Sequence, residues 1–361
     1  MREKRFHNQV AWLTFLFSIL VIWVHSYNIE LFQGDLSGAA WDAAAAVEQL
    51  VSVKAGQLAV PGFFMISSYL FFRNFTWEKL TGKWQSRFFS IVVPYIAWNL
   101  LYYLGYVTAT RLPVVQYVVG KAPVLFSVRE ALNAVFSYSY APIFWYLYQL
   151  IFLILLAPLI YILVRDCRAG ALYLAVLLVA VHFRLDTGHP NTDALFYFSF
   201  AAYAALHGRK TAEGEGGVKG LPVGLMVLAA GIFCGCRMED PGADVLWTVL
   251  YRWLLPVSLW FLAGSVSFPE TRLWMRQSIF IYAVHYIVVR FVNKGAAMLL
   301  WRLFAGSIVG EKILLIGALA IYFALPALTV CVSYVLAQIL VRWFPAVWKI
   351  LSGGRELVHG K

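Results

Sequence analysis

The chain has 361 residues, of which 61% are hydrophobic and only 13% are charged, and its mean hydropathy is +0.73. Soluble domains contain about 45–50% apolar and about 25% charged residues, so this composition excludes a soluble protein and predicts an integral membrane protein. A net charge of +11 can indicate a nucleic-acid partner, but Lys and Arg are spread over short connections here and form no basic arm. We therefore expect no nucleic-acid binding, and we attribute the basic residues to membrane topology.

Apolar segments long enough to cross a bilayer recur along the chain. A membrane-spanning helix needs about 20 mostly apolar residues, and ten segments meet or approach that length. The last of them is long enough to contain a kink at Pro326. The sequence predicts an all-α bundle of about ten transmembrane helices, which occupies residues 1–361 as a single domain with no separate soluble domain. The predicted spans lie near residues 9–32, 57–73, 87–107, 143–164, 170–184, 192–208, 220–236, 245–268, 277–301 and 312–344.

The positive-inside rule agrees with this order of helices. With the N-terminus in the cytoplasm, 18 of the 29 Lys and Arg residues fall into predicted cytoplasmic segments, and both termini are expected there. Two long connections, 33–56 and 108–142, then lie outside. The first predicts a short Ala-rich helix after Ser37 or Asp42, and the second an amphipathic segment on the membrane surface, from "FSVRE" and "NAVFSYSY". The cytoplasmic segments lie near 2–5, 73–87, 165–168, 209–219, 272–276 and 342–361.

A histidine ends the apolar run "TFLFSILVIWVHSYN" at the point where the hydrocarbon should continue. Ionisable groups within transmembrane segments are costly and are functional candidates by default. At about 100° per residue, Thr14, Ser18 and His25 fall on one face of a helix, and the first and last differ by only about 20°. This polar stripe is expected to face a cavity or neighbouring helices, with His25 in the outer half of the membrane. From helix geometry alone, a hydrogen bond from His25 to a neighbouring helix is an equally good interpretation.

A second intramembrane histidine, His285, lies in "SIFIYAVHYIVVR". Tyr282 comes three residues earlier and shares its face of the helix, although a Tyr–His contact is also ordinary bundle packing. The chain has no Gly-rich phosphate loop, no Gly-x-Ser-x-Gly elbow, no His-Glu-x-x-His motif and no ladder of intramembrane acids, which disfavours hydrolases and proton pumps. No metal site is expected, because the four cysteines lack zinc spacing; they are interpreted as core thiols. They are Cys167, Cys234, Cys236 and Cys331.

Several segments together resemble the membrane acyltransferase-3 family. "LVIWVHSYN" is similar to the family's apolar run ending in His-Ser, and "VPGFFMISSYLFFRN" resembles its Pro-x-Phe-Phe-x-x-Ser-Gly-Tyr-Leu element. "RFFSIVVPYIAWNLLYY" resembles its Arg-led Pro-Tyr-x-x-Trp helix, "APIFWYLYQLIFLILLAPL" its Trp-Tyr-Leu helix, and "SIFIYAVHYIVV" its Ser-x-x-Ile-Tyr-x-x-His segment. This chain departs from the pattern with Thr14 where the family usually has Arg, Ser68 where Gly is common, and Tyr286 where Pro often follows the histidine.

The resemblance implies a ten-helix enzyme of the bacterial cytoplasmic membrane. Such an enzyme moves an acyl group, commonly acetyl from cytoplasmic acetyl-CoA, onto a hydroxyl of an envelope polysaccharide or glycolipid. It is an acyl-CoA-dependent O-acetyltransferase with no permanently bound cofactor, and its partners are the lipid bilayer, acyl-CoA and the glycan acceptor. His25 inherits the role of the essential histidine, either as a general base or as the carrier of the acyl group. Possible supporting residues are Thr14, Ser18, Tyr282, His285 and Glu48.

Two further expectations concern the partners of this histidine and of the donor. A catalytic base is usually oriented by a carboxylate or a carbonyl, and Asp35, Asp42 and Glu48 in the outer connection are the candidates. Arg73 and Arg87 flank family-like segments on the cytoplasmic side and are the candidates to bind the phosphates of acyl-CoA. Two other functions stay open at this point. A transporter or flippase for a small solute or lipid-linked sugar would use the same cavity without acyl transfer, and a membrane sensor would tolerate the loss of His25.

Overall fold

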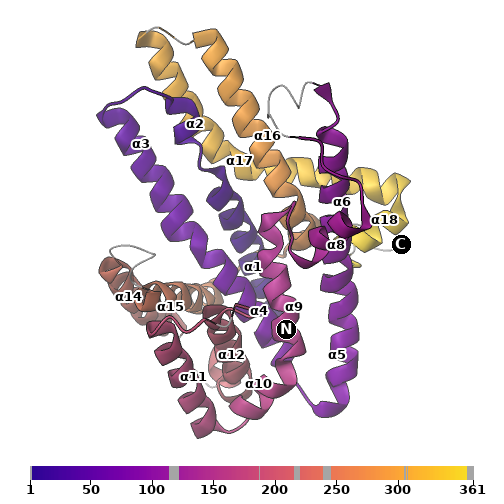
Figure 1. Ribbon diagram of the computed structural model, residues 1–361. Coiled ribbons are helices and arrows are strands. Elements are labelled where there is room, and N and C mark those ends of the chain that lie inside the picture. Colours follow the sequence, from indigo (N-terminus) through magenta and orange to yellow (C-terminus); the bar gives the residue numbers. More distant parts are fainter. Residues whose placement is uncertain are drawn as a thin grey trace.

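Helices make up the regular structure of the computed structural model, and the residues that it describes contain no strand (Figure 1). Parts of the predicted connections, at 114–121, 215–219 and 356–361, lie outside those residues. The all-α class is thus confirmed for the described part of the chain. The described residues are 2–113, 122–186, 188–214, 220–238, 245–304, 306 and 308–355.

The first span, α1 (Arg2–Ser26), ends one residue after His25. A short helix, α2 (Ile29–Gln33), follows after a break at Tyr27 and Asn28. The Glu48 carboxylate accepts hydrogen bonds from the backbone N–H groups of Asn28 and Ile29, at 2.9 and 3.2 Å. A carboxylate at this position caps the free amides at the start of a helix, which explains how the chain can break here inside the protein.

The helix predicted after Ser37 begins at Ala39, but the expectation that it is short is wrong. It is α3 (Ala39–Gln49), and it continues through a π-helical turn (Leu50–Ala55) and a 3-10 turn (Gly56–Leu58) into α4 (Ala59–Phe72). The whole run of 34 residues is long and apolar enough to cross a membrane. At Gly62 an added Cβ would lie 2.3 Å from the Phe17 ring, so a glycine is needed where this helix packs against α1.

A second long run covers Trp77–Ala109, which includes α5 (Leu80–Arg87), a π-helical turn (Phe88–Val92) and α6 (Val93–Ala109). The predicted span at 87–107 therefore starts a full helix earlier than expected.

The amphipathic segment expected in the following connection is α8 (Val128–Phe136). The Ser127 side chain caps it by accepting a hydrogen bond from the N–H of Glu130. Val128, Leu132 and Phe136 recur every four residues and are 77%, 52% and 64% exposed. An exposed apolar stripe of this kind is typical of a helix that lies on a membrane surface.

The predicted single span at 143–164 is broken. Helices α9 (Trp145–Leu155) and α10 (Ala157–Val164) meet at an angle of 61°. Pro158, in the first turn of α10, has no N–H to continue the hydrogen bonding of α9, which accounts for the bend. The next two predicted spans are helices of only 16 residues each, α11 (Cys167–His182) and α12 (Thr192–His207).

The remaining predicted spans are long helices. Among the described residues, seven helical runs are long and apolar enough to cross a membrane, or eight if the bent pair counts as one. The number ten and the side on which the termini lie stay predictions. Helix α17 contains Pro326 within its length. The bounds are α13 (Arg209–Ala212), α14 (Gly220–Arg237), α15 (Val245–Gly264), α16 (Ser278–Phe304), α17 (Ile308–Trp343) and α18 (Pro345–Ser352).

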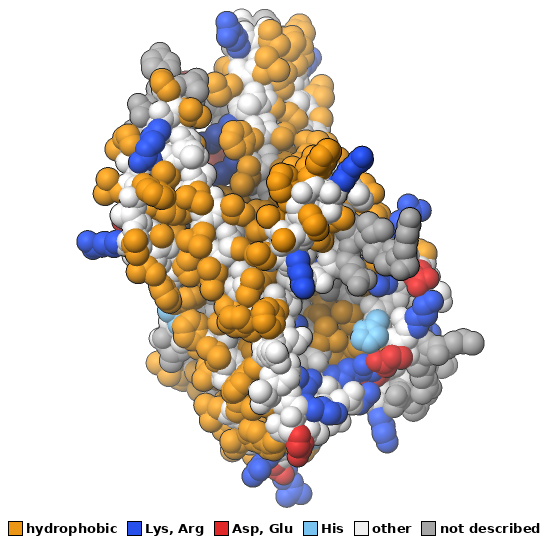
Figure 2. All heavy atoms as spheres, turned by 90° about the vertical axis from the view of Figure 1, so that its right-hand side faces the viewer, with side chains coloured by type: hydrophobic (Ala, Val, Ile, Leu, Met, Phe, Trp, Pro, Cys, Tyr) orange, Lys and Arg blue, Asp and Glu red, His pale blue; other side chains and the backbone are white. Residues whose placement is uncertain are grey.

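Helix α1 runs through the middle of the bundle and packs against α4, α16 and α17. At one end of the molecule, at the top of Figure 1, α2 and α3 lie beside the ends of α16 and α17. Helices α5, α10 and α11 reach the opposite end. Apolar side chains cover the middle of the face shown in Figure 2, whereas basic and acidic side chains gather at its lower end. The packing of α1 on α16 brings together the two histidines that the sequence singles out.

Candidate active site

His25 meets two side chains of α16. Its ring centre lies 5.2 Å from that of His285, with the ring planes at 43°, and 5.6 Å from that of Tyr286, which it contacts edge to face. His25 is exposed, whereas His285 is fully buried and Tyr286 is 8% exposed. The two predicted histidines therefore form one cluster, in which only His25 is accessible.

The hydrogen bonds of His285 fix the form of its ring. Its Nδ1 contacts the backbone carbonyl oxygen of Tyr282, one turn earlier on α16, so Nδ1 carries the proton and donates it. In the neutral ring Nε2 is then an acceptor, and it has no partner among the described residues although it is buried. Buried polar atoms are nearly always hydrogen-bonded, and an unpaired one costs about 1–3 kcal/mol. An unpaired acceptor beside His25 thus marks this place as a functional candidate.

Tyr282 connects α16 to the segment that precedes α9. Its hydroxyl donates to the carbonyl oxygen of Ile143, and its ring is 5.5 Å from His285 and 5.8 Å from Tyr146. Tyr282 is 7% exposed. These contacts hold α16 at the position where His285 meets His25.

Glu48 is fully buried, but its hydrogen bonds go to the backbone of Asn28 and Ile29 and not to His25. Asn28 also donates to the Asn293 side chain of α16, and Asn293 in turn donates to the carbonyl oxygen of Ser26. These bonds fix the end of α1 to α16 one residue after His25. Glu48 therefore contacts the helix break that follows His25 and not His25 itself, and the other two predicted carboxylates, Asp35 and Asp42, are exposed.

The polar stripe of α1 is present, but it is not a row of free hydroxyl groups. The Ser18 hydroxyl donates to the carbonyl oxygen of Thr14, at 2.9 Å, and Ser18 is buried. Such a bond within a helix satisfies the hydroxyl locally. Of the three residues of the stripe, only His25 is both exposed and in contact with α16.

Arg73 lies in a cluster of paired charges near the start of α1. Its guanidinium donates to both oxygens of Glu213, at 2.8 and 2.9 Å, and to the carboxylate of Glu3. The Glu213 carboxylate also accepts hydrogen bonds from Tyr69 and Arg209. Burial raises the pKa of Glu213, but the bonds from Arg73 and Tyr69 outweigh it, so the pKa lies below its usual value. Two carboxylates thus already neutralise the charge of Arg73.

Arg87 has a different environment. It is half-buried at the end of α5 and makes no ion pair within the described ranges. Arg355, in the segment after α18, lies near it, and both are close to Tyr146. Burial, followed by the positive charge of Arg87, lowers the pKa of Arg355 to about 10. Two neighbouring cations without a carboxylate form a place where an anion would be stabilised.

The segment that carries Arg355 is held by backbone contacts. The Trp98 indole of α6 donates to the carbonyl oxygen of Leu351, and the Trp348 indole donates to that of Arg355. Gly353 has a φ of +69°, and a Cβ on it would lie 2.6 Å from the carbonyl oxygen of Ser90. A glycine is therefore required at this approach, which brings the terminal segment to within one turn of Arg87.

The acyltransferase-3 family model, described as an acyltransferase domain, matches residues 9–338. The chain belongs to the acyltransferase-3 family. The match covers nearly the whole sequence, contains His25, His285 and Arg87, and ends before Arg355. It supports acyl transfer as the function. No curated protein and no solved structure matches the chain.

One charged residue of this acyltransferase escaped the sequence-based prediction. The Arg290 guanidinium carbon lies 4.4 Å from the centre of the Tyr286 ring, one turn earlier on α16. Tyr286 is also the residue that contacts His25 edge to face. The four-residue spacing of Tyr and Arg in "YIVVR" is a signal that could have revealed this pair.

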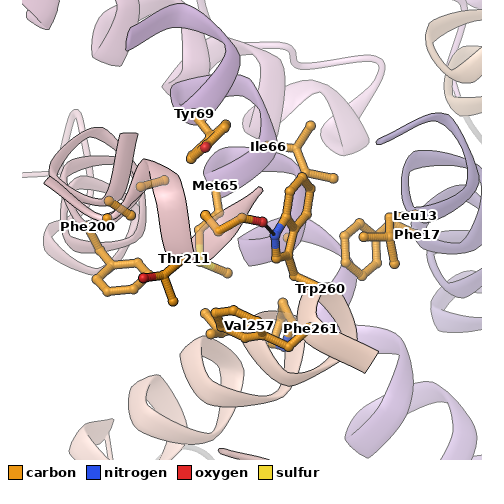
Figure 3. A pocket seen from close by; sticks show the side chains of 16 residues that line it. Leu13, Phe17, Met65, Ile66, Tyr69, Phe200, Thr211, Val257, Trp260 and Phe261 are labelled. Carbon is orange, nitrogen blue, oxygen red and sulfur yellow. Dashed lines mark hydrogen bonds between the residues drawn. The ribbon is translucent and has the colours of Figure 1, made fainter. Parts of the chain in front are cut away.

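A cavity of about 310 Å³ lies between α1, α4, α12 and α15 (Figure 3). Leu13, Phe17, Met65 and Trp260 are among the side chains that line it, and the Trp260 indole donates to the carbonyl oxygen of Ala212. Its surface is almost entirely apolar and suits a hydrocarbon chain better than phosphates or sugar hydroxyls. Leu13 and Phe17 lie about 100° around α1 from Thr14 and Ser18, so this cavity is separate from His25.

Proposed function

We propose that this acyltransferase moves an acyl group, with acetyl as the expected one, from cytoplasmic acyl-CoA to a hydroxyl of an envelope glycan or glycolipid, in a bacterial cytoplasmic membrane. The observation that carries the proposal is the pairing of an exposed histidine with a buried histidine that has an unpaired acceptor nitrogen. It occurs in a chain of an acyltransferase family.

In the proposed reaction, the His25 ring removes the proton from the acceptor hydroxyl. The oxygen forms a bond to the carbonyl carbon of the thioester, the carbon–sulfur bond breaks, and the thiolate of CoA takes the proton back from His25. An imidazole can both accept a proton and return it, which suits both steps. The alternative is that His25 attacks the thioester itself and then passes the acyl group to the hydroxyl. Acyl-enzyme that forms from labelled acyl-CoA without acceptor would distinguish this second route.

The proposed role of His285 follows from its unpaired Nε2. When His25 gains a proton, a neighbouring acceptor nitrogen can hold the new N–H in place or share its proton. Because the Nδ1 proton of His285 is held by the Tyr282 carbonyl, Nε2 stays available as the acceptor. His285 thus acts on the reaction through His25 and is a positioning residue.

For the donor, the contacts favour Arg87 over Arg73. The two carboxylates on Arg73 would have to be displaced by a phosphate, whereas Arg87 and Arg355 form no ion pair with any described residue. The rings of Tyr146, Tyr282 and His285 connect this pair to His25. The ring centres of Tyr146 and Tyr282 are 5.8 Å apart, and those of Tyr282 and His285 are 5.5 Å apart. The proposed course of the acyl arm runs along these rings, and the phosphates stay at the arginines.

The test is mass spectrometry of envelope glycans from cells with the wild-type protein, with His25→Ala and with neither. We expect the glycans to carry the added mass of an acyl group, about 42 Da for acetyl, only in cells with the wild-type protein. His182→Ala is the matched control, because His182 is an exposed histidine on α11, and it should keep the acyl mass. Identical glycan profiles in all strains would contradict acyl transfer and would favour a transporter or a sensor.

A further inference from the structure

Arg290 lies at the level of His25 on the neighbouring helix. Along α16 it falls between His285, whose ring meets His25, and Asn293, which donates to the carbonyl oxygen of Ser26. Its guanidinium is held over the face of Tyr286, and the edge of that ring contacts His25. The charge of Arg290 therefore belongs to the site, although no function is yet assigned to it.

No carboxylate in the described part of the chain neutralises this charge. Within the described residues Arg290 forms no ion pair. A tyrosine face attracts a guanidinium by about 0.5–1 kcal/mol or more, but it carries no negative charge. Glu48, the buried acid at this end of α1, accepts both backbone hydrogen bonds through Oε2, its Oε1 has no hydrogen-bond partner among the described residues, and it forms no ion pair with Arg290 there. A cation in a membrane span usually has a partner, so the missing anion here points to a ligand.

The exposure of the cluster indicates from which side that ligand comes. His285 and Tyr282 are buried, at 0% and 7% exposed, whereas His25 and Arg290 are both exposed. Helix α16 runs from the predicted cytoplasmic side outward, and Arg290 is five residues farther along it than His285. A molecule that reaches His25 from outside thus meets Arg290 first.

We propose that Arg290 binds an anionic group of the acceptor, so that the substrate class is an acidic glycan or glycolipid with a carboxylate or phosphate near the acylated hydroxyl. A guanidinium suits either group, because its planar fork can donate two parallel hydrogen bonds to carboxylate or phosphate oxygens. The proposal rests on the proposed function for the identity of the acceptor, but the anion site itself does not depend on acyl transfer.

The test measures binding to the purified full-length protein in detergent, without any acyl-CoA. The carboxylate probes are cellobiouronic acid and its neutral counterpart cellobiose, and the phosphate probes are glucose 1-phosphate and glucose. We expect the wild type to bind at least one acidic probe about tenfold more tightly than its neutral partner, as one charge-assisted pair allows. The pair that shows the preference tells a carboxylate acceptor from a phosphorylated one.

Arg290→Gln should abolish this preference, and Arg290→Lys should retain part of it. Lys294→Gln is the matched control, because it removes an exposed cation one turn farther along α16 and should keep the full preference. The proposal is overturned if the wild type shows no preference, if Arg290→Gln keeps it, or if Lys294→Gln loses it equally. The first of these results is expected if Arg290 instead extends to lipid head groups. If the wild type prefers the acidic probes but transfers no acyl group from acyl-CoA, acyl transfer is refuted and the anion site is still supported.

Discussion

The two polar clusters along α1 differ in how completely their groups are paired. Near the start of the helix, Arg73 is surrounded by Glu3 and Glu213, and each charge has a partner. Near its end, His25 lies beside His285 and near Arg290; among the described residues, His285 Nε2 has no hydrogen-bond partner and Arg290 has no carboxylate partner. Fully paired charges hold helices together, whereas unpaired ones cost free energy and persist where a ligand completes them. The comparison separates structural from functional polar residues in one helix.

The largest expected effect comes from breaking the paired cluster. Arg73→Gln leaves the buried Glu213 carboxylate with only Arg209 and Tyr69 as partners. It should lower the free energy of unfolding by about 3 kcal/mol, which is the low end for breaking a buried ion pair, because Arg209 remains. SDS titration of the protein in detergent measures it. The KM for acyl-CoA of the protein that stays folded should not change. A raised KM with unchanged stability would reverse the roles that we give to Arg73 and Arg87.

The same cluster predicts a dependence of stability on pH. The pKa of Glu213 is lower in the folded protein than in the unfolded chain. Its stabilisation is therefore fully present above the unfolded pKa, and it is lost as the pH falls through the folded value. Glu213→Gln should be less stable than the wild type at neutral pH, and the difference should shrink on acidification. Parallel stability curves for the two proteins would contradict this assignment.

Removing the unpaired Nε2 of His285 should affect catalysis. Converted to free energy, this effect should be slightly smaller than the loss of stability expected for Arg73→Gln. His285→Ala is expected to lower kcat about 100-fold, the low end for acid–base assistance, and to change the pH profile of kcat. KM for acyl-CoA should stay the same. His207→Ala is the matched control, because His207 is also bonded to a backbone carbonyl but lies away from His25. Equal losses in both variants would show that His285 only stabilises the fold.

A smaller effect is expected at the two unpaired arginines. Arg87→Gln and Arg355→Gln should each raise the KM for acyl-CoA about tenfold, the loss of one charge-assisted hydrogen bond, with little change in kcat. Lys349→Gln, which removes a cation from the same terminal segment, should leave KM unchanged. If Arg87→Gln alone has an effect, the terminal segment does not take part in donor binding.

The smallest effect is expected at Glu48. A glutamine side-chain oxygen can still accept from the N–H groups of Asn28 and Ile29, so Glu48→Gln should keep activity within about threefold. Glu48→Ala leaves both amides without a partner and should lower activity more. Equal and large losses in Glu48→Gln and Glu48→Ala would show that the charge of Glu48, and not its role as a helix cap, supports His25.

Local pattern accounts for the residues that the sequence singled out. His25, His285 and Tyr282 stand out because polar residues interrupt apolar runs, and helix periodicity places them on common faces. The family match also confirms the resemblance drawn from these motifs. The helix from Ala39 to Phe72 was cut short in the prediction because its middle, "VKAGQ", is polar and contains a glycine, yet π and 3-10 turns keep it helical.

Long-range packing accounts for what the sequence could not predict. No local pattern shows that Glu213, in a connection, reaches Arg73, or that Arg355 reaches Arg87 after the last helix. Both contacts depend on how distant helices cross. The sequence offered Glu48, beside Asp35 and Asp42, as a candidate partner of His25, but its bonds to the backbone could be seen only once the break after Ser26 was known.

Transfer of labelled acetyl from acetyl-CoA to envelope glycan, in membranes that contain equal amounts of wild type or His25→Ala, tests the central claim most directly. We expect His25→Ala to transfer no more label than membranes without the protein. Undiminished transfer by His25→Ala would remove His25 from the chemistry.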